Sequence, residues 1–524
     1  MTINDDTPVI GKHILTTLTT GMYQDPRMIY REYIQNSADQ IDTLTEDELE
    51  DKLRQTIEID IDEKKRIVTI TDRATGIPRK TFKNRLLNVA DSHKDPSKNK
   101  GFRGIGRLAG LSYCQKLIFE SSAKGETTVS RLEMDGSEMI RILHDVNDRS
   151  LAGDVIKKIS KITYKEDAEK DYNCWFKVIL EDVRKDVGSQ LLDVDSVKEF
   201  IAQIAPVPFS NMNFKSGKDI AIAARKAGVR LEEYTVRVNG VTITKLYKDI
   251  LNDAHGRKLG SVGKVEYRLI EWRDKKLAWG WFALPDKGIS LPSSTNPERK
   301  IRLRKGNIQI GFEDYLDSYF PEARSNGYML GEIHLLSDKI LPNGDRNALE
   351  VSEEAAALTD RLRNKYFKDL WAAAHKANEL NNARKAIDDY QRKCEEIAEL
   401  SKDGIVEGVA IKKSELEKAY EKALSGQQKL KKVVTAPIKG EFVKGVVDVM
   451  AGDNRDKITD MAKPEMVGKE CVSKSKKTDS SEKVKTEDVK LKNAIIKVLV
   501  NNGLEPMKAL DIANKINEEL SATE

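Results

Sequence analysis

The stretch from Lys100 to Cys114, KGFRGIGRLAGLSYC, contains four glycines within its first eleven residues and then continues as an apolar run. Glycine loses more conformational freedom on folding than any other residue, so this cluster indicates tight turns or a backbone that closely approaches another group. Successive backbone N–H groups in such a loop, followed by a helix N-terminus, can bind an anion such as phosphate. On its own the pattern is a weak signal, and the rest of the chain must decide its meaning.

The length of 524 residues predicts several domains. The 89 basic and 85 acidic residues nearly balance, which excludes a global field that would require nucleic acid or a membrane as partner. The N-terminal MTINDDTPVIGKH lacks the apolar core of a signal peptide, and no apolar run is long enough to span a bilayer. The cysteines are far apart, with no C-x-x-C pair, so neither a zinc site nor a disulfide framework is expected. We therefore expect a cytoplasmic protein with no membrane contact.

Hydrophobic periodicity divides the chain into five parts. Residues 27–42 have helical spacing, and TIEIDIDEKKRIVTITD alternates on both sides of a polar turn, as a β-hairpin does. The expected fold is α/β throughout the first two domains, followed by a helical C-terminal region. The expected boundaries are 1–185 and 186–365 for the two α/β domains, 366–435 for a helical or coiled-coil arm, 436–488 for a linker and 489–524 for a small helical module.

Three polar side chains share one face of the first predicted helix. Glu32, Asn36 and Asp39 are spaced i, i+4 and i+7 in REYIQNSAD. An ordinary solvated stripe would have the same spacing. Alternatively, the amide oxygen of Asn36 suits Mg²⁺, and a glutamate one turn earlier could deprotonate an attacking water beside metal-bound phosphates.

A carboxylate also ends the predicted hairpin. Asp72 is followed by Gly76 in DRATGIP. A buried aspartate there could accept a hydrogen bond from an exocyclic amine such as that of adenine. The competing interpretation is a turn capped by an aspartate, which is common in such sequences.

Taken in order, a helix with E-x-x-x-N-x-x-D, a hairpin, D-x-[AG]-x-G, a lysine-bearing lid and G-x-x-G-x-G resemble the GHKL ATPase superfamily with its Bergerat nucleotide fold. The resemblance implies that Glu32 is the general base, Asn36 the Mg²⁺ ligand and Asp72 the adenine anchor, with Lys94 to Lys100 as the lid. Ala74 stands where the family usually has a glycine. The ATP-binding residues implied in this way are Asn36, Asp39, Asp72, Gly76, Ile77, Lys94, Gly101, Phe102, Arg103, Gly104, Ile105 and Gly106.

The second domain resembles the transducer of the same superfamily, a ribosomal S5-like α/β domain. DKILPNGDRNALE is similar to the segment with which ninety-kilodalton heat-shock chaperones present an arginine to the terminal phosphate, and Arg346 is the matching position. Lys305 is the alternative, as the phosphate-sensing lysine of gyrase and MutL relatives. Of the superfamily's branches, the chaperone-like and MORC-like ones fit this chain best.

Two functions follow from the resemblance. The preferred one is an ATP-hydrolysing clamp that forms a homodimer through its ATPase domains and acts on a protein client. The alternative is a scaffold that senses nucleotide, with little turnover, and recruits a partner through its helical region. Nucleic acid is a candidate partner because of the basic runs QQKLKKVV and SKSKK.

Overall fold

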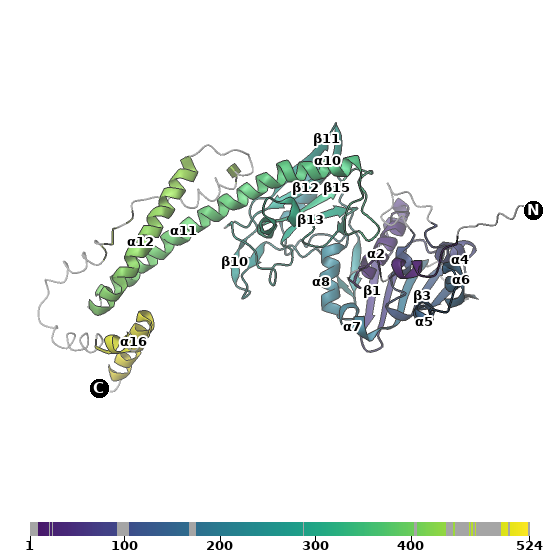
Figure 1. Ribbon diagram of the computed structural model, residues 1–524, viewed down its shortest axis with the longest axis horizontal. Helices are drawn as coiled ribbons and strands as arrows, with labels where there is room; N and C mark the ends of the chain where they lie inside the picture. Colours follow the sequence, from purple (N-terminus) through teal and green to yellow (C-terminus); the bar gives the residue numbers. More distant parts are fainter. Residues whose placement is uncertain are drawn as a thin grey trace, which may run out of the picture. The chain divides into compact units, whose positions relative to one another are not determined.

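The computed structural model describes residues 9–19, 21–23, 25–91, 104–166, 174–286, 288–402, 406–435, 444–445, 461, 463–464, 467, 494–500 and 504–521. The chain divides into two compact units (Figure 1). The first contains Met1–Pro285 and Ser290–Lys368, and the second contains Asp286–Ile289 and Asp369–Glu524. The mixed α/β fold of the first unit and the helical second unit confirm the expected fold class.

The first unit begins with a mixed sheet of eight strands in the order β5-β4-β3-β6-β2-β1-β7-β8. The strands are β1 (Thr56–Asp62), β2 (Ile67–Asp72), β3 (Cys114–Ser122), β4 (Thr128–Asp135), β5 (Ser160–Glu166), β6 (Trp175–Val183), β7 (Thr235–Val238) and β8 (Val241–Thr242). Neighbours are antiparallel, except that β1 and β7 run parallel. The sheet therefore includes two strands that lie beyond the expected domain boundary at residue 185.

The predicted hairpin is confirmed, with Ile59 opposite Ile70 in the β1–β2 register. Alternating isoleucines and valines of these strands face a core that also receives the apolar residues of the covering helices. Helix α2 packs against β1, β2 and α8 (Figure 1). The helices of this part are α1 (Ile14–Leu18), α2 (Met28–Ile41), α3 (Glu46–Leu49), α4 (Arg79–Leu87), η1 (Gly106–Leu108), α5 (Gly136–His144), α6 (Ala152–Ile159), α7 (Lys185–Leu191) and α8 (Val194–Ile204).

A second sheet of five strands follows, in the order β11-β12-β15-β13-β14. Its core includes an aromatic cluster, in which the rings of Phe209, Phe214, Tyr247 and Trp281 pack in tilted or edge-to-face pairs. The elements here are α9 (Ser216–Lys226), β9 (Ile250–Asn252), β10 (Lys258–Ser261), β11 (Glu266–Trp272), β12 (Lys275–Ala283), β13 (Lys300–Lys305), β14 (Ile308–Ile310), η2 (Asp317–Tyr319), η3 (Ala323–Tyr328), β15 (Leu330–Leu335), α10 (Glu353–Arg361) and η4 (Leu362–Tyr366).

A buried charge cluster joins this second sheet to α8. Glu332 on β15 is fully buried and pairs with Lys245 Nζ at 2.7 Å and with Arg304 Nε at 2.6 Å. Burial alone would raise the pKa of Glu332, but the charges of Arg304 and Lys245 outweigh burial and hold it well below its usual value. Arg304 also donates from Nη2 to the carbonyl of Gln203 at 2.7 Å. Since removing one member of a buried ion pair is strongly destabilising, this cluster fixes the second sheet against the last turn of α8.

The second unit is built from helices α11 (Phe367–Lys402), whose first two residues belong to the first unit, α12 (Val406–Thr435) and α16 (Pro506–Ser521), with a further helical segment at 494–500. Helices α11 and α12 cross at Gly426, where an added Cβ would lie 2.9 Å from the carbonyl oxygen of Ala383. The tilted rings of Tyr390 and Tyr420 pack across the same pair of helices, with ring centroids 5.3 Å apart. The expected helical arm is therefore a packed pair of helices.

Candidate functional site

Helix α2 is buried on nearly all sides. Of its fourteen residues, only Asn36 and Gln40 are not classed as buried. Glu32 and Asp39 are both buried, and Asn36 between them is half-buried. The side chains of a solvated polar stripe would face water. Because Glu32 and Asp39 are buried, they do not belong to such a stripe. Charged side chains are rarely buried without a specific partner or ligand.

The Glu32 carboxylate lies between the glycine loop and an arginine. A Cβ added to Gly106 would lie 2.3 Å from Glu32 Oε2, so the bare backbone of this glycine is pressed against the carboxylate. On the other side, Arg31 Nη2 lies 3.5 Å from Glu32 Oε1. Any side chain at position 106 would have to displace the Glu32 carboxylate, and this explains why the position is occupied by glycine.

Asp72 ends β2 and is almost completely buried. Ser37 Oγ donates to its Oδ2 at 3.0 Å, and the backbone N–H of Ala74 donates to its Oδ1 at 3.2 Å. Burial raises the pKa of Asp72 to about 7, although both hydrogen bonds act in the opposite direction. A carboxylate has about four acceptor positions, so two donors leave capacity for a ligand amine. Ser37 was not identified from the sequence, because its role depends on a residue in a distant strand.

The turn after Asp72 requires glycine at position 76. Gly76 has φ +64°, and a Cβ there would lie 2.2 Å from the carbonyl oxygen of Ser122. The next residue, Ile77, is buried and donates its N–H to Ser121 Oγ at 2.6 Å. The turn is thereby fixed against the end of β3.

Two further residues hold this turn, and sequence patterns gave no sign of either. Arg54 Nη2 donates to the carbonyl of Ala74 at 2.8 Å, and Cys174 Sγ donates to the same carbonyl, also at 2.8 Å. Arg54 also pairs with Glu48 at 3.0 Å. Because these contacts lie one or two residues from Asp72, they restrict where its carboxylate can point.

The glycine loop is described from Gly104 onward. Gly104 has φ +69°, and its carbonyl accepts from Arg107 Nε at 3.1 Å. After Ile105, the expected helix start is only the three-residue 3₁₀ turn η1. The prediction of a helix N-terminus directly after this loop was therefore wrong. The predicted residues Lys94, Gly101, Phe102 and Arg103 lie outside the described residues.

The two candidate phosphate-sensing cations lie in the second half of the first unit. Arg346 is buried, with φ +54°, in the loop after β15. The carbonyl of the preceding residue, Asp345, accepts from Arg31 Nη2 at 2.9 Å. Lys305 Nζ donates to the carbonyl of Ser337 at 2.7 Å, and burial lowers the pKa of Lys305. The structure therefore brings the Arg346 loop into contact with Arg31, the residue before Glu32. The ammonium group of Lys305 instead binds the carbonyl of Ser337, near the end of β15.

The donor set fits a magnesium nucleotide. The described residues contain no group of three or more His, Cys, Asp or Glu side chains able to hold a metal by themselves. A Mg²⁺ ion would be held by Asn36 together with phosphate oxygens and water, as this ion prefers. It would neutralise charge on the phosphates. Gly76 and Gly106 pack their bare backbones against the Ser122 carbonyl oxygen and the Glu32 carboxylate, respectively.

Comparison with known proteins agrees with this geometry. No curated protein matches the chain. Where the structure describes the chain, it contains no helix long and apolar enough to cross a membrane. Residues 27–161, which hold Glu32, Asn36, Asp72 and the glycine loop, match the family described as histidine kinase-, DNA gyrase B-, and HSP90-like ATPase. This match supports placing the N-terminal part of the chain in the GHKL superfamily.

Proposed function

We propose that this protein binds ATP with Mg²⁺ and hydrolyses it to ADP and phosphate. The observation that carries the proposal is the pair of buried carboxylate sites along α2. Ser37 contacts Asp72 and Glu32 contacts Gly106, and these two residues of α2 are separated by about 7.5 Å of helix axis at 1.5 Å per residue. One helix thus contributes a contact to each of the two carboxylates that the proposal uses.

Each residue has a distinct role in this proposal. Asp72 accepts a hydrogen bond from the exocyclic amine of adenine, while Gly76 and Ile77 form the wall beside the base. Glu32 takes a proton from the water that attacks the terminal phosphorus, and the bond from that phosphorus to the leaving ADP oxygen breaks. Arg346, carried by the loop that already reaches α2, stabilises charge on the transferred phosphoryl group.

The decisive experiment substitutes Glu32→Gln. The amide keeps the size of the side chain but cannot accept the proton, so kcat is expected to fall by about 10²- to 10⁴-fold while ATP binding persists. Glu63→Gln, in the exposed turn between β1 and β2, is the matched control and should hydrolyse ATP as the wild type does. Steady-state phosphate release and ATP titration measure the two quantities. Turnover that survives in Glu32→Gln would exclude Glu32 as the general base.

A nucleotide-driven homodimer is part of the same proposal. The N-terminal segment exposes Val9 and Ile10 at 69% and 65%, and Leu151 beside them at 37%. The two chain segments are joined by a bridge between Gly11 and Leu151 and by a hydrogen bond from Ala152 N–H to the Ile10 carbonyl. Adjacent exposed apolar side chains on a folded domain favour an interaction site, and a second copy of the ATPase half is the partner we propose.

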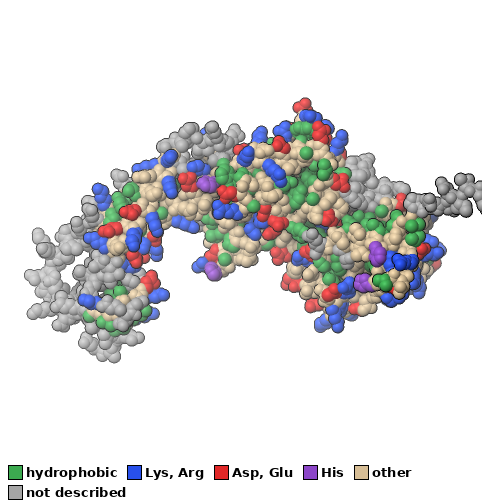
Figure 2. Space-filling view, viewed as in Figure 1, with side chains coloured by type: hydrophobic (Ala, Val, Ile, Leu, Met, Phe, Trp, Pro, Cys, Tyr) green, Lys and Arg blue, Asp and Glu red, His purple; other side chains and the backbone are tan. Residues whose placement is uncertain are grey.

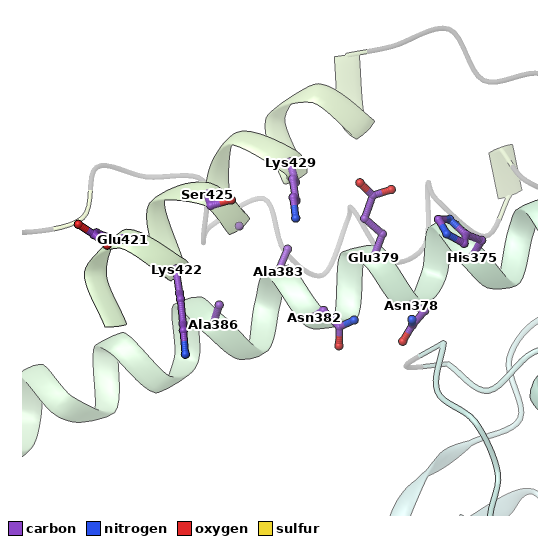
Figure 3. A pocket seen from close by; sticks show the side chains of 11 residues that line it. His375, Asn378, Glu379, Asn382, Ala383, Ala386, Glu421, Lys422, Ser425 and Lys429 are labelled. Carbon is purple, nitrogen blue, oxygen red and sulfur yellow. The ribbon is translucent and has the colours of Figure 1, made fainter. Parts of the chain in front are cut away.

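The second candidate function is a nucleotide-sensing scaffold. A groove of about 680 Å³ lies between α11 and α12, and Figure 3 shows polar and charged side chains from both helices around it. Among them are His375, Asn378 and Asn382 from α11, with Lys422 and Lys429 from α12. Such a groove favours recruitment of a partner. A scaffold would bind ATP without Glu32-dependent turnover, and neither DNA nor unfolded client protein would change its rate.

On the face that Figure 2 shows, basic side chains do not gather into a nucleic-acid surface, and the basic run SKSKK lies outside the described residues. Figure 2 shows basic and acidic side chains intermingled over the visible face, in keeping with 89 basic and 85 acidic residues. A continuous basic surface is the usual electrostatic footprint of nucleic-acid binding. A protein client therefore remains the preferred partner in either proposal.

A further inference from the structure

Arg31 is one of the largest fully buried side chains of the protein, with 2% of its surface exposed. It directly precedes the proposed general base, Glu32. Burying a guanidinium is costly unless it is paired and hydrogen-bonded. The partners of Arg31 therefore indicate the role of this buried guanidinium.

The guanidinium of Arg31 reaches two different parts of the first unit. Its Nη2 donates to the carbonyl of Asp345 at 2.9 Å and lies 3.5 Å from Glu32 Oε1. The shorter contact sets where the guanidinium lies, and the longer one brings its charge to the Glu32 carboxylate. Arg31 Nε has no hydrogen-bond partner within the described part of the chain. The side chain is thus shared between the hydrolysis site and the loop of Arg346, and it is not fully satisfied by either.

That loop is held in a single strained conformation. Arg346 has positive φ, which is uncommon for a residue other than glycine. Its N–H donates to the Asn343 carbonyl at 3.1 Å, and its carbonyl accepts from Gly311 N–H at 2.8 Å. Ala348 N–H donates to Asn343 Oδ1 at 3.1 Å. Because Asp345 is covalently joined to Arg346, a displacement of the Arg346 backbone toward a phosphate also moves the carbonyl that binds Arg31.

We propose that Arg31 is a positioning residue that couples the Arg346 loop to the orientation of the Glu32 carboxylate. When the loop moves, Arg31 loses the Asp345 carbonyl and its charge shifts relative to Glu32, so hydrolysis depends on the position of the second sheet's loop. This inference rests on the proposed ATPase function. It adds a residue that touches neither the nucleotide nor the water.

The first test requires no catalysis. Arg31→Met keeps the length of the side chain and removes its charge and donors, whereas Arg31→Lys keeps the charge on a single donor group. Without nucleotide, the amides of Arg346 and Ala348 should exchange hydrogen at least about 10-fold faster in Arg31→Met than in the wild type. Arg27→Lys is the control, because Arg27 precedes the same helix but binds Asp25 and Ser196. Amides of β12 should be unchanged in every variant, which excludes general loosening.

The second test is kinetic. In Arg31→Met, kcat should fall at least about 10-fold while KM changes less than about 3-fold, and Arg31→Lys should recover part of the loss. Unchanged amide exchange in the loop, or a wild-type kcat, would overturn the proposal. A rise in KM that accounts for all of the loss would overturn it as well.

The two tests separate this inference from the proposed function. If the wild type shows no Glu32-dependent turnover, the proposed function fails and the kinetic part of this inference fails with it. The exchange measurement still decides whether Arg31 holds the loop. If turnover depends on Glu32 but not on Arg31, the proposed function stands and the inference is overturned.

Discussion

Burial of the ionised Asp72 carboxylate lowers the stability of the folded protein, which a purely structural aspartate would avoid. Burial raises the pKa of Asp72 to about 7, so the folded protein binds this proton more tightly than the unfolded chain does. The stability contributed by Asp72 is therefore fully present below the pKa of an ordinary aspartate and is lost as the pH rises through about 7. A residue that destabilises the empty protein at neutral pH is more easily explained by a ligand that favours its ionised form.

This cost predicts a pH dependence of nucleotide binding. A hydrogen bond from the adenine amine favours ionised Asp72, so ATP should bind more tightly as the pH rises from 6 to 8. Asp72→Asn should weaken binding about 10- to 100-fold, as loss of a charge-assisted hydrogen bond does, and it should remove this part of the pH dependence. Calorimetric titrations at several pH values measure both effects. The variant leaves the titration of the phosphates unchanged, so equal slopes for variant and wild type would contradict the assignment.

The same residues show how far the sequence could lead. The spacing of Glu32, Asn36 and Asp39 and the position of Asp72 after a strand were visible in local patterns. The hydrogen-bond partners of the site residues were not visible in local patterns. Ser37 meets Asp72, and Arg31 meets Asp345, only after distant segments of the chain come together. Local periodicity encodes which face of an element is buried, but it does not encode which polar atom lies opposite. The site's residue types were therefore predictable, whereas its hydrogen bonds were not.

Among the secondary-structure elements, the helices and strands near the site agree closely with expectation. The predicted helix over residues 27–42 is α2 (Met28–Ile41), and the hairpin is β1 with β2. The expectation failed at the glycine loop, which leads into a three-residue 3₁₀ turn and not into an α-helix. Assignment of β7 to the first sheet also could not be predicted, because parallel pairing across a long connection leaves no local signal.

The crossing of α11 and α12 yields a prediction about these two helices. In Gly426→Ala, the new Cβ would meet the Ala383 carbonyl oxygen at 2.9 Å, so the helices must separate slightly. We expect destabilisation of this pair by about 1–3 kcal/mol, as overpacking usually causes. Gly188→Ala in α7 is the matched control, because its Cβ would make only an ordinary contact with Leu192 Cδ1 at 3.7 Å and should stabilise its helix by about 0.5–1 kcal/mol. Thermal unfolding followed by circular dichroism compares the two, and a stabilised Gly426→Ala would show that the crossing is looser than described.

For the molecule as a whole, the exposed N-terminal apolar residues predict the behaviour of the proposed dimer. Ile10→Glu places a charge where a second copy would pack, so a nonhydrolysable ATP analogue should no longer produce a dimer. Monomer stability should change little, because Ile10 is 65% exposed. Ile222→Glu on α9, at a position 52% exposed, is the control and should dimerise normally. Sedimentation velocity with and without the analogue distinguishes the species, and a dimer that persists in Ile10→Glu would place the interface elsewhere.

The position of β7 has a consequence for how this chain is made. Thr56 to Ile59 on β1 pair with Thr235 to Val238, which the ribosome adds long after the glycine loop and α7. Until then, a nascent chain carries the whole family-matched segment with one strand edge open, and such an edge readily pairs with another chain. A premature stop or a protease cut before Thr235 would therefore release an aggregation-prone fragment rather than an independent ATP-binding half.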